Sequence, residues 1–242
     1  MILANVRASL ERDDAQLALR LIAGGSGREL DQAEAALRDG GIDALLDDPR
    51  LVAAMLANHL GSHASLPLFC YVIVRHAMRN VGENDRALAD YVAAILLHFG
   101  IRGRAERISD ADDERYDTLA SLVQALDDPD ARRNFLVRQH LGNYALWLSG
   151  LFPDMIEHRR WRRGGPDLDY YEDLGRRGFQ LAADHRLAQE NGLADLFHDA
   201  AERFGALRMA LNGISDSLLF PNHHSPDRLM RQVRDEARWR KS

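Results

Sequence analysis

Hydrophobic residues recur along most of this chain at the three- and four-residue spacing of an amphipathic α-helix. The clearest stripe consists of Leu88, Tyr91, Val92, Ile95, Leu96 and Phe99. Helix-starting signals elsewhere in the chain also indicate helices. Ser26 with Glu29 forms a capping-box pattern, and Asp48 precedes a proline. Gly24 and Gly100 follow periodic segments, as helix-ending glycines do. The pattern predicts an all-α fold, a multi-helix bundle of roughly ten helices.

The expected helices cover about residues 2–23, 26–40, 49–60, 65–81, 84–100, 119–126, 130–151, 167–191 and 193–220, with a basic terminal helix from 226. Asn84 is the expected cap of the helix to residue 100. The apolar run 66–74 also fits a buried strand, but a strand without a partner leaves backbone groups unpaired, so a helix is preferred. The polar stretch 101–113 predicts a loop between an acidic lobe, 1–110, and a second lobe, 111–242, packed as one unit.

Composition and charge narrow the class of protein. The chain has 242 residues, 46% of them hydrophobic and 28% charged, which is typical of soluble globular proteins. A net charge of -6 argues against duplex nucleic acid as a partner. The chain lacks the ~18-residue apolar stretch of a membrane span, and its start becomes acidic too early for a secretory signal, so we expect a cytoplasmic protein.

Two residue types carry little chemical information. Cys70 is the one cysteine, and it lies in an apolar run where a thiol packs as a small hydrophobe. Among 31 basic residues only Lys241 is lysine. Such a bias is typical of a GC-rich genome, so arginine abundance alone does not indicate function.

Polar residues interrupt the apolar side of the helix expected over 130–151. His140, Asn143, Tyr144 and Trp147 share one side at i, i+3, i+4 and i+7. Buried polar groups need hydrogen-bond partners, so these residues could simply fix helix packing. Alternatively they form one wall of a small-molecule pocket, which combines apolar surface with a few convergent polar groups.

Small residues interrupt the stripe of the next long helix. Gly175 and Gly178 lie between Tyr171 and His185 on one side. A glycine inside a helix costs about 1 kcal/mol relative to alanine, so something should compensate. Either a neighbouring helix approaches closely, or the surface leaves space for a ligand.

An arginine cluster lies between these two helices. Arg159, Arg160, Arg162 and Arg163 surround Trp161, and two glycines and a proline follow. Guanidinium groups beside a helix start suit a phosphate or carboxylate. Against this, the acidic residues that follow can neutralise the cluster as an ordinary solvated surface.

Motifs for other chemistry are weak. Asp195, His198, Asp199 and Glu202 share one helix side, but a helical di-metal site needs matching pairs on facing helices, so no metal is expected. The chain has no G-x-S-x-G motif, no P-loop and no dinucleotide-binding glycine pattern. The sequence therefore indicates no cofactor.

The leading hypothesis is a helical binding or regulatory protein. It would hold an anionic or aromatic small molecule, or a partner segment, in a groove between the helices 130–151 and 167–191. The residues expected to line this groove are His140, Asn143, Tyr144, Trp147, Arg159, Arg160, Arg162, Arg163, Tyr170, Tyr171 and His185. One alternative is an enzyme with His140 or His185 as general base. Another is an interaction protein that forms a homo-oligomer.

Overall fold

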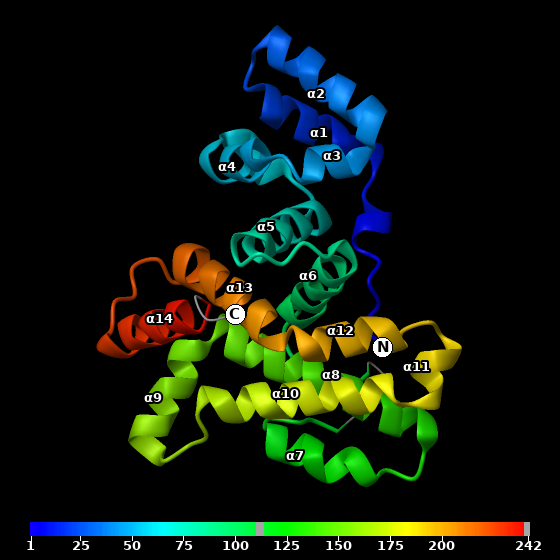
Figure 1. Cartoon of the computed structure of the whole chain (residues 1–242), viewed down its shortest axis with the longest axis vertical. Helices are drawn as coiled ribbons and strands as arrows, with labels where there is room; N and C mark the ends of the chain where they lie inside the picture. Colours follow the sequence, from blue (N-terminus) through cyan, green and yellow to red (C-terminus); the bar gives the residue numbers. More distant parts are fainter. Residues whose placement is uncertain (110–113, 240–242) are drawn as a thin grey trace. The chain divides into compact units, whose positions relative to one another are not determined.

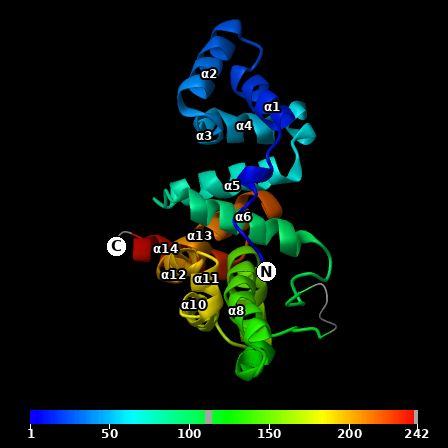
Figure 2. The same ribbon diagram turned by 90° about the vertical axis from the view of Figure 1, so that its right-hand side faces the viewer.

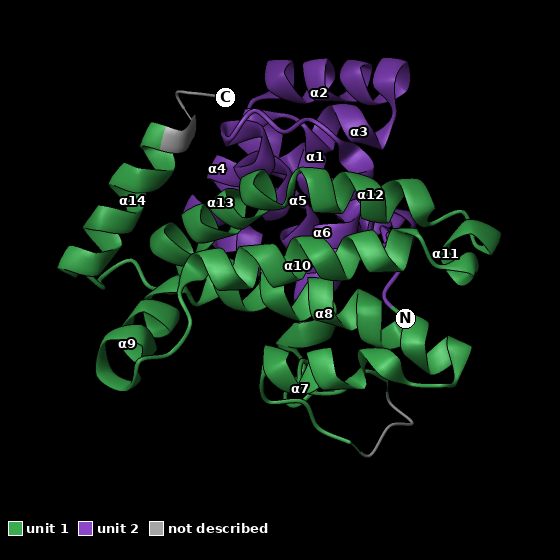
Figure 3. Ribbon diagram, turned by 60° about the horizontal axis from the view of Figure 1, so that its bottom comes forward, with its two compact units in different colours: residues 1, 98–242 green, residues 2–97 purple. Residues whose placement is uncertain are grey.

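The computed structural model describes residues 1–109 and 114–239, and this part of the chain is all-α (Figure 1). It contains helices α1 to α14, short 3₁₀ turns, one π-helical turn and no strand. The predicted fold class is confirmed. The chain divides into two compact units (Figure 3). Residues 2–97, purple and labelled unit 2 in the figure, are here the first unit along the chain, and residues 98–242 together with Met1, green and labelled unit 1, are the second.

The first unit is built from helices joined by short turns. Its elements are η1 (Arg7–Ser9), α1 (Arg12–Ala23), α2 (Gly27–Gly40), α3 (Ile42–Leu46), α4 (Pro49–Ala57), η2 (His59–His63), α5 (Leu66–Asn80) and most of α6 (Arg86–Gly100). As predicted, the Ser26 side chain accepts from the Glu29 amide at the start of α2, and Asp48 caps α4. The run 66–74 is helical, so the strand alternative is wrong.

Ion pairs around Asp47 link the end of α3 to α5 and α6. Arg75, on α5, donates from Nε to the Asp47 carboxylate at 2.7 Å, directly after α3. Arg86, at the start of α6, donates to the other oxygen of Asp47 at 2.6 Å. The carboxylate therefore joins three segments that are distant in the sequence.

The second unit is organised around α8, which packs along α10 (Figures 1 and 3). Its elements are α7 (Leu119–Gln124), η3 (Ala125–Asp127), α8 (Ala131–Leu151), α9 (Pro153–Arg163), α10 (Leu168–Ala183), α11 (Arg186–Glu190), α12 (Ala194–Glu202), α13 (Phe204–Ile214), the π-helical η4 (Ser215–Leu219) and α14 (Pro226–Trp239). Asp130 caps α8 and Asp167 caps α10 through their carboxylates. Seen from the side, α8 and α10 again lie together (Figure 2).

Several predicted boundaries are wrong. The first α-helix begins at Arg12, because Glu11 and Asp14 form its capping box, and residues 7–9 form a 3₁₀ turn. Asp85 rather than Asn84 accepts from the first amides of α6. Of the loop predicted over 101–113, residues 110–113 lie outside the described part of the chain.

Two long helices predicted in the second unit are divided. The segment 167–191 breaks after Ala183, where His185 caps the short helix α11. The segment 193–220 divides at Arg203 into α12 and α13, and the latter continues into the π-helical turn. The arginine cluster, which was expected between two helices, is itself helical and forms the last turns of α9.

Candidate functional site

Most of the predicted pocket wall on α8 is buried. His140 is 4% exposed, bonds through Nε2 to the Ala105 carbonyl at 3.0 Å and lies against the rings of Phe99 and Tyr144. Asn143 is 1% exposed, and Trp147 packs edge-on against Phe99. An imidazole buried in this way is not exposed to an incoming substrate, so the geometry gives no support to the prediction of His140 as a general base.

The groove expected between α8 and α10 is filled. A Cβ added at Gly178 would lie 2.6 Å from the Gly142 amide nitrogen, and one added at Gly175 would lie 2.3 Å from the Phe204 ring. The glycines therefore serve close packing of α10 against α8 and α13. The alternative of a space left for a ligand at these positions is wrong.

The remaining predicted residues are divided between two ends of α10. Tyr171 is buried near Tyr144, and both lie close enough to Arg159 for its charge to act on them. Burial is the main reason that the pKa of Tyr144 rises to about 12, and Arg159 opposes the increase. Tyr170 is partly exposed beside Tyr171.

His185 lies at the other end of α10. Its Nδ1 accepts from the Leu187 amide at 3.1 Å, and its ring stacks on Phe135. Burial lowers the pKa of this imidazole, and the nearby charge of Arg138 adds to the effect. Its ring therefore has a structural role, as the cap of α11.

The arginine cluster lies on the surface. Arg159, Arg160, Arg162 and Arg163 are exposed, as is Trp161 at 70%. Arg160 pairs with Glu157 at 3.7 Å and covers the Trp161 ring at 5.7 Å from its centroid. The structure brings only Arg159 of this cluster near the predicted tyrosines, so the predicted residues do not form one site.

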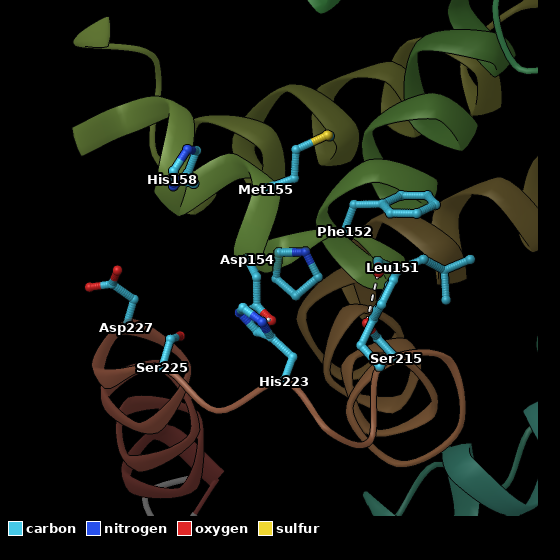
Figure 4. A pocket seen from close by; sticks show the side chains of 11 residues that line it. Leu151, Phe152, Asp154, Met155, His158, Ser215, His223, Ser225 and Asp227 are labelled. Atoms are coloured by element: carbon cyan, nitrogen blue, oxygen red, sulfur yellow. Dashed lines mark hydrogen bonds and ion pairs between the residues drawn. The ribbon is translucent and has the colours of Figure 1, made fainter. Parts of the chain in front are cut away.

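The strongest candidate site is a cavity of about 370 Å³ at the carboxyl end of α8 (Figure 4). Residues from two stretches of the chain, 151–158 and 215–227, line it, namely Leu151, Phe152, Pro153, Asp154, Met155, His158, Ser215, Phe220, His223, Ser225 and Asp227. Leu151, Phe152, Met155 and Phe220 make much of its wall apolar. Sequence reasoning assigned no role to this set.

Local hydrogen bonds shape the cavity. Pro153 starts α9 directly after α8, so the chain turns at Phe152. The hydroxyl of Ser215 donates to the Leu151 carbonyl at 2.7 Å, and the Asn212 amide donates to the Ser149 and Gly150 carbonyls. These bonds satisfy carbonyls that the end of a helix leaves free, and they hold the π-helical turn η4 beside the cavity.

The charged groups behind the cavity are paired. Asp154 accepts from Arg228 Nη2 at 2.6 Å and lies 3.4 Å from Arg231. Arg231 also donates to Asp216 at 2.8 Å. These ion pairs hold α14 in place, and they neutralise Asp154.

Three polar side chains at the opening are exposed. His158 and Asp227 lie on opposite sides of it, and His223 lies beside Asp154, with Nε2 at 3.7 Å from Oδ2 (Figure 4). No side-chain hydrogen bond or ion pair joins His158 or Asp227 to another described residue. The proline-flanked segment containing His223 offered one sequence signal, but its default interpretation is an exposed loop.

Comparisons with known proteins add no assignment. The chain matches no protein-family model, no characterised protein and no solved structure. In the described residues, no helix is both long enough and apolar enough to span a membrane. Among the same residues, no three His, Cys, Asp or Glu side chains are grouped to hold a metal ion.

Proposed function

We propose that this protein is a binding protein for a small apolar molecule that carries an amino group, and that the ligand occupies the cavity at the end of α8. The observation that carries the proposal is the combination of an apolar wall with three exposed polar side chains at the opening. Such a combination is typical of small-molecule sites, in which apolar contact gives affinity and a few polar groups fix orientation.

The size of the cavity defines the body of the ligand. A dry cavity of about 150 Å³ in another protein is enough to hold benzene. At about 370 Å³ the present cavity has room for a body of two fused rings. Phe152 and Phe220 supply aromatic contact for such a body.

The chemistry at the opening favours an ammonium group. The Asp227 carboxylate is an acceptor, and an imidazole such as that of His158 or His223 offers one acceptor nitrogen in its neutral form. An ammonium has three donors, which suits an opening lined by acceptors. A carboxylate would meet at most one donor on each neutral ring and would lie beside Asp227.

This proposal differs from the anionic ligand expected from the arginine cluster. None of the four arginines lines the cavity. Arg228 and Arg231, which lie behind it, are already bound to Asp154 and Asp216. The cations of this region are therefore not available to an incoming anion at the opening.

A matched series of indoles tests the proposal by thermal shift. Tryptamine, tryptophol and indole-3-propionate share one ring system and carry an ammonium, a hydroxyl and a carboxylate. Because a ligand that prefers the folded state raises the melting temperature, we expect the largest increase with tryptamine. Asp227→Asn should remove most of that increase, and Met155→Trp, which fills the cavity, should remove it for every member.

Two outcomes would contradict the proposal. A larger shift with indole-3-propionate, lost when the four arginines of α9 are replaced by glutamine, would restore the anion hypothesis. A tryptamine shift that Met155→Trp leaves unchanged would place the ligand elsewhere. Asp199→Asn, an exchange on α12 outside the lining, is the matched control for loss of a carboxylate.

A further inference from the structure

Helix α14 presents its apolar side to solvent. Leu229, Met230 and Val233 are 60%, 65% and 53% exposed, whereas Arg228 and Arg231 are 5% and 1% exposed. A surface helix ordinarily does the opposite and buries its apolar stripe. Figures 1 and 3 show α14 at the edge of its unit.

Ion pairs explain how the helix is held in this orientation. Arg228 and Arg231 bind Asp154 and Asp216, and Asp235 accepts from Arg208 Nη2 at 2.7 Å. Arg208, on α13, is itself buried. The charged side of α14 therefore contacts the unit, and the stripe formed by Leu229, Met230 and Val233 remains uncovered.

We propose that this stripe is a dimer interface, and that a second copy of the same helix covers it in antiparallel orientation. A two-fold axis near residue 231 places Leu229 of one copy opposite Val233 of the other. The same axis brings exposed Pro226 within one residue of the level of exposed Ala237. In a two-fold symmetric pair of helices, every contact between a residue of one copy and a residue of the other occurs twice.

Charge complementarity supports a second copy as the occupant. Asp227 and Arg234 lie seven residues apart, or about two helical turns, and so border the stripe on the same side. In the antiparallel pair, Asp227 of each copy faces Arg234 of the other. Arg234 is 39% exposed and lies 3.6 Å from Glu157, which leaves other donors of its guanidinium free for a second carboxylate.

The other border of the stripe argues against an anionic membrane surface as the occupant. Gln232 and Glu236 are exposed there, and membrane-surface helices are instead rich in lysine and arginine beside their apolar side. Glu236 and Asp227 together would be repelled by acidic headgroups. A short interface of three turns is at the small end of protein interfaces, so we expect a weak dimer.

Sedimentation equilibrium of the full chain over about 5 to 500 µM tests the proposal, since this range brackets weak self-association. We expect a concentration-dependent dimer that Leu229→Glu with Val233→Glu converts to monomer. Leu66→Glu, at a leucine in the other unit that is 71% exposed, is the matched control and should leave the dimer unchanged.

Charge reversal tests the register. Asp227→Arg and Arg234→Asp each place two like-charged pairs across the axis, and each should weaken the dimer about tenfold. A heterodimer of the two variants has only complementary pairs across the axis. The mixture should therefore associate although each variant alone does so weakly. Because these variants keep the stripe, a misfolded helix cannot explain restoration in the mixture.

Three results would overturn the proposal: a monomer throughout the concentration range, a dimer that survives Leu229→Glu with Val233→Glu, or a mixture that stays monomeric. The dimer proposal does not rest on the amine-binding proposal. It is tested without ligand, whereas the indole series reads binding by thermal shift, so each can fail alone.

Discussion

Gly178 is a position where one missing side chain determines how two helices pack. The backbone of α8 occupies the place of a Cβ, at 2.6 Å from the Gly142 nitrogen and 3.1 Å from the Arg138 oxygen. Backbone atoms cannot move aside as a flexible side chain can. We therefore expect Gly178→Ala to destabilise the protein by about 2 to 4 kcal/mol, measured by urea unfolding.

Gly213 provides the matched control. It lies in α13, is exposed, and has nothing within 4 Å of an added Cβ. Since alanine is the better helix former, Gly213→Ala should stabilise the protein by about 0.5 to 1 kcal/mol. Equal effects of the two exchanges would refute the packing explanation for the glycines of α10.

Asp47 gives the first unit a pH-dependent component of stability. Its burial acts to raise the pKa, but hydrogen bonds from Arg75 and Arg86 outweigh this and lower the pKa to about 2 from 3.8. A carboxyl with a lowered folded-state pKa stabilises fully above its unfolded value and loses this contribution as the pH falls through the folded value. The loss should occur between about pH 4 and 2 and reach up to about 2 kcal/mol.

The urea midpoint of Asp47→Asn at pH 6 and at pH 3 checks this prediction. The variant should be less stable than the natural protein at pH 6, and the difference should shrink at pH 3. Asp31→Asn, an exchange at an exposed position of α2, is the control. A difference that stays constant with pH would show that the carboxylate charge is not what stabilises the pair.

From single residues, the sequence predicts interactions with nearby backbone groups, such as helix caps. The caps Ser26 and Asp48 were predictable because each acts on amides two or three residues away. The role of His185 was not predictable, because whether its imidazole caps a helix or faces a cavity depends on where the helix α10 ends. The burial of His140 likewise depends on Phe99 and Ala105, which are distant in the sequence.

At the scale of helices, periodicity predicted the element type better than the breaks. The stripe of 167–191 continues through the junction of α10 and α11, so the break after Ala183 leaves no gap in the pattern. The amphipathic pattern of α14 also predicts a helix correctly. It could not predict which side is buried, because the carboxylates that bind Arg228 and Arg231 come from α9 and η4.

Asp154 is expected to control whether α14 stays docked. Asp154→Asn removes the carboxylate that binds Arg228 and Arg231, whose side chains are 6% and 2% exposed. Arg228 and Arg231 keep Asp216 as a partner, at 3.4 and 2.8 Å, so the loss should stay below the about 3 to 5 kcal/mol that a buried charge without any partner costs. Amides of α14 should therefore exchange with solvent markedly faster, as measured by hydrogen exchange with mass spectrometry.

A surface pair is the control for this effect. Asp199 lies 3.9 Å from Arg203 on α12, and such pairs contribute about 0 to 1 kcal/mol. Asp199→Asn should leave exchange in α14 as it is. If Asp154→Asn also leaves it unchanged, the ion pairs do not determine the orientation of α14, and the exposed stripe needs another explanation.

At the scale of the molecule, the all-α class was predictable and the candidate cavity was not. Its wall combines residues 151–158 with residues 215–227, which share no local pattern. The π-helical turn that contributes Ser215 follows from bonds to the end of α8, and a helical period does not reveal it. The division of the chain into two compact units falls between residues 97 and 98.

The cavity and the dimer interface share one residue, so the two proposals together predict linkage. Asp227 lies at the opening of the cavity, and in the antiparallel pair it faces Arg234 of the second copy. One carboxylate cannot serve an ammonium and a guanidinium equally well, and coupling between two binding events is reciprocal. Tryptamine should therefore weaken the dimer, and dimerisation at higher protein concentration should in turn weaken tryptamine binding.

Sedimentation equilibrium with saturating tryptamine measures this linkage, and tryptophol separates charge from bulk. Tryptophol fills the same cavity but carries no charge to compete for Asp227, so it should change the dimer less than tryptamine does. An equal effect of the two would mean that the ligand acts through the shape of the cavity. No effect of either would place the ammonium away from Asp227, because a carboxylate at the interface cannot be occupied without consequence for the second copy.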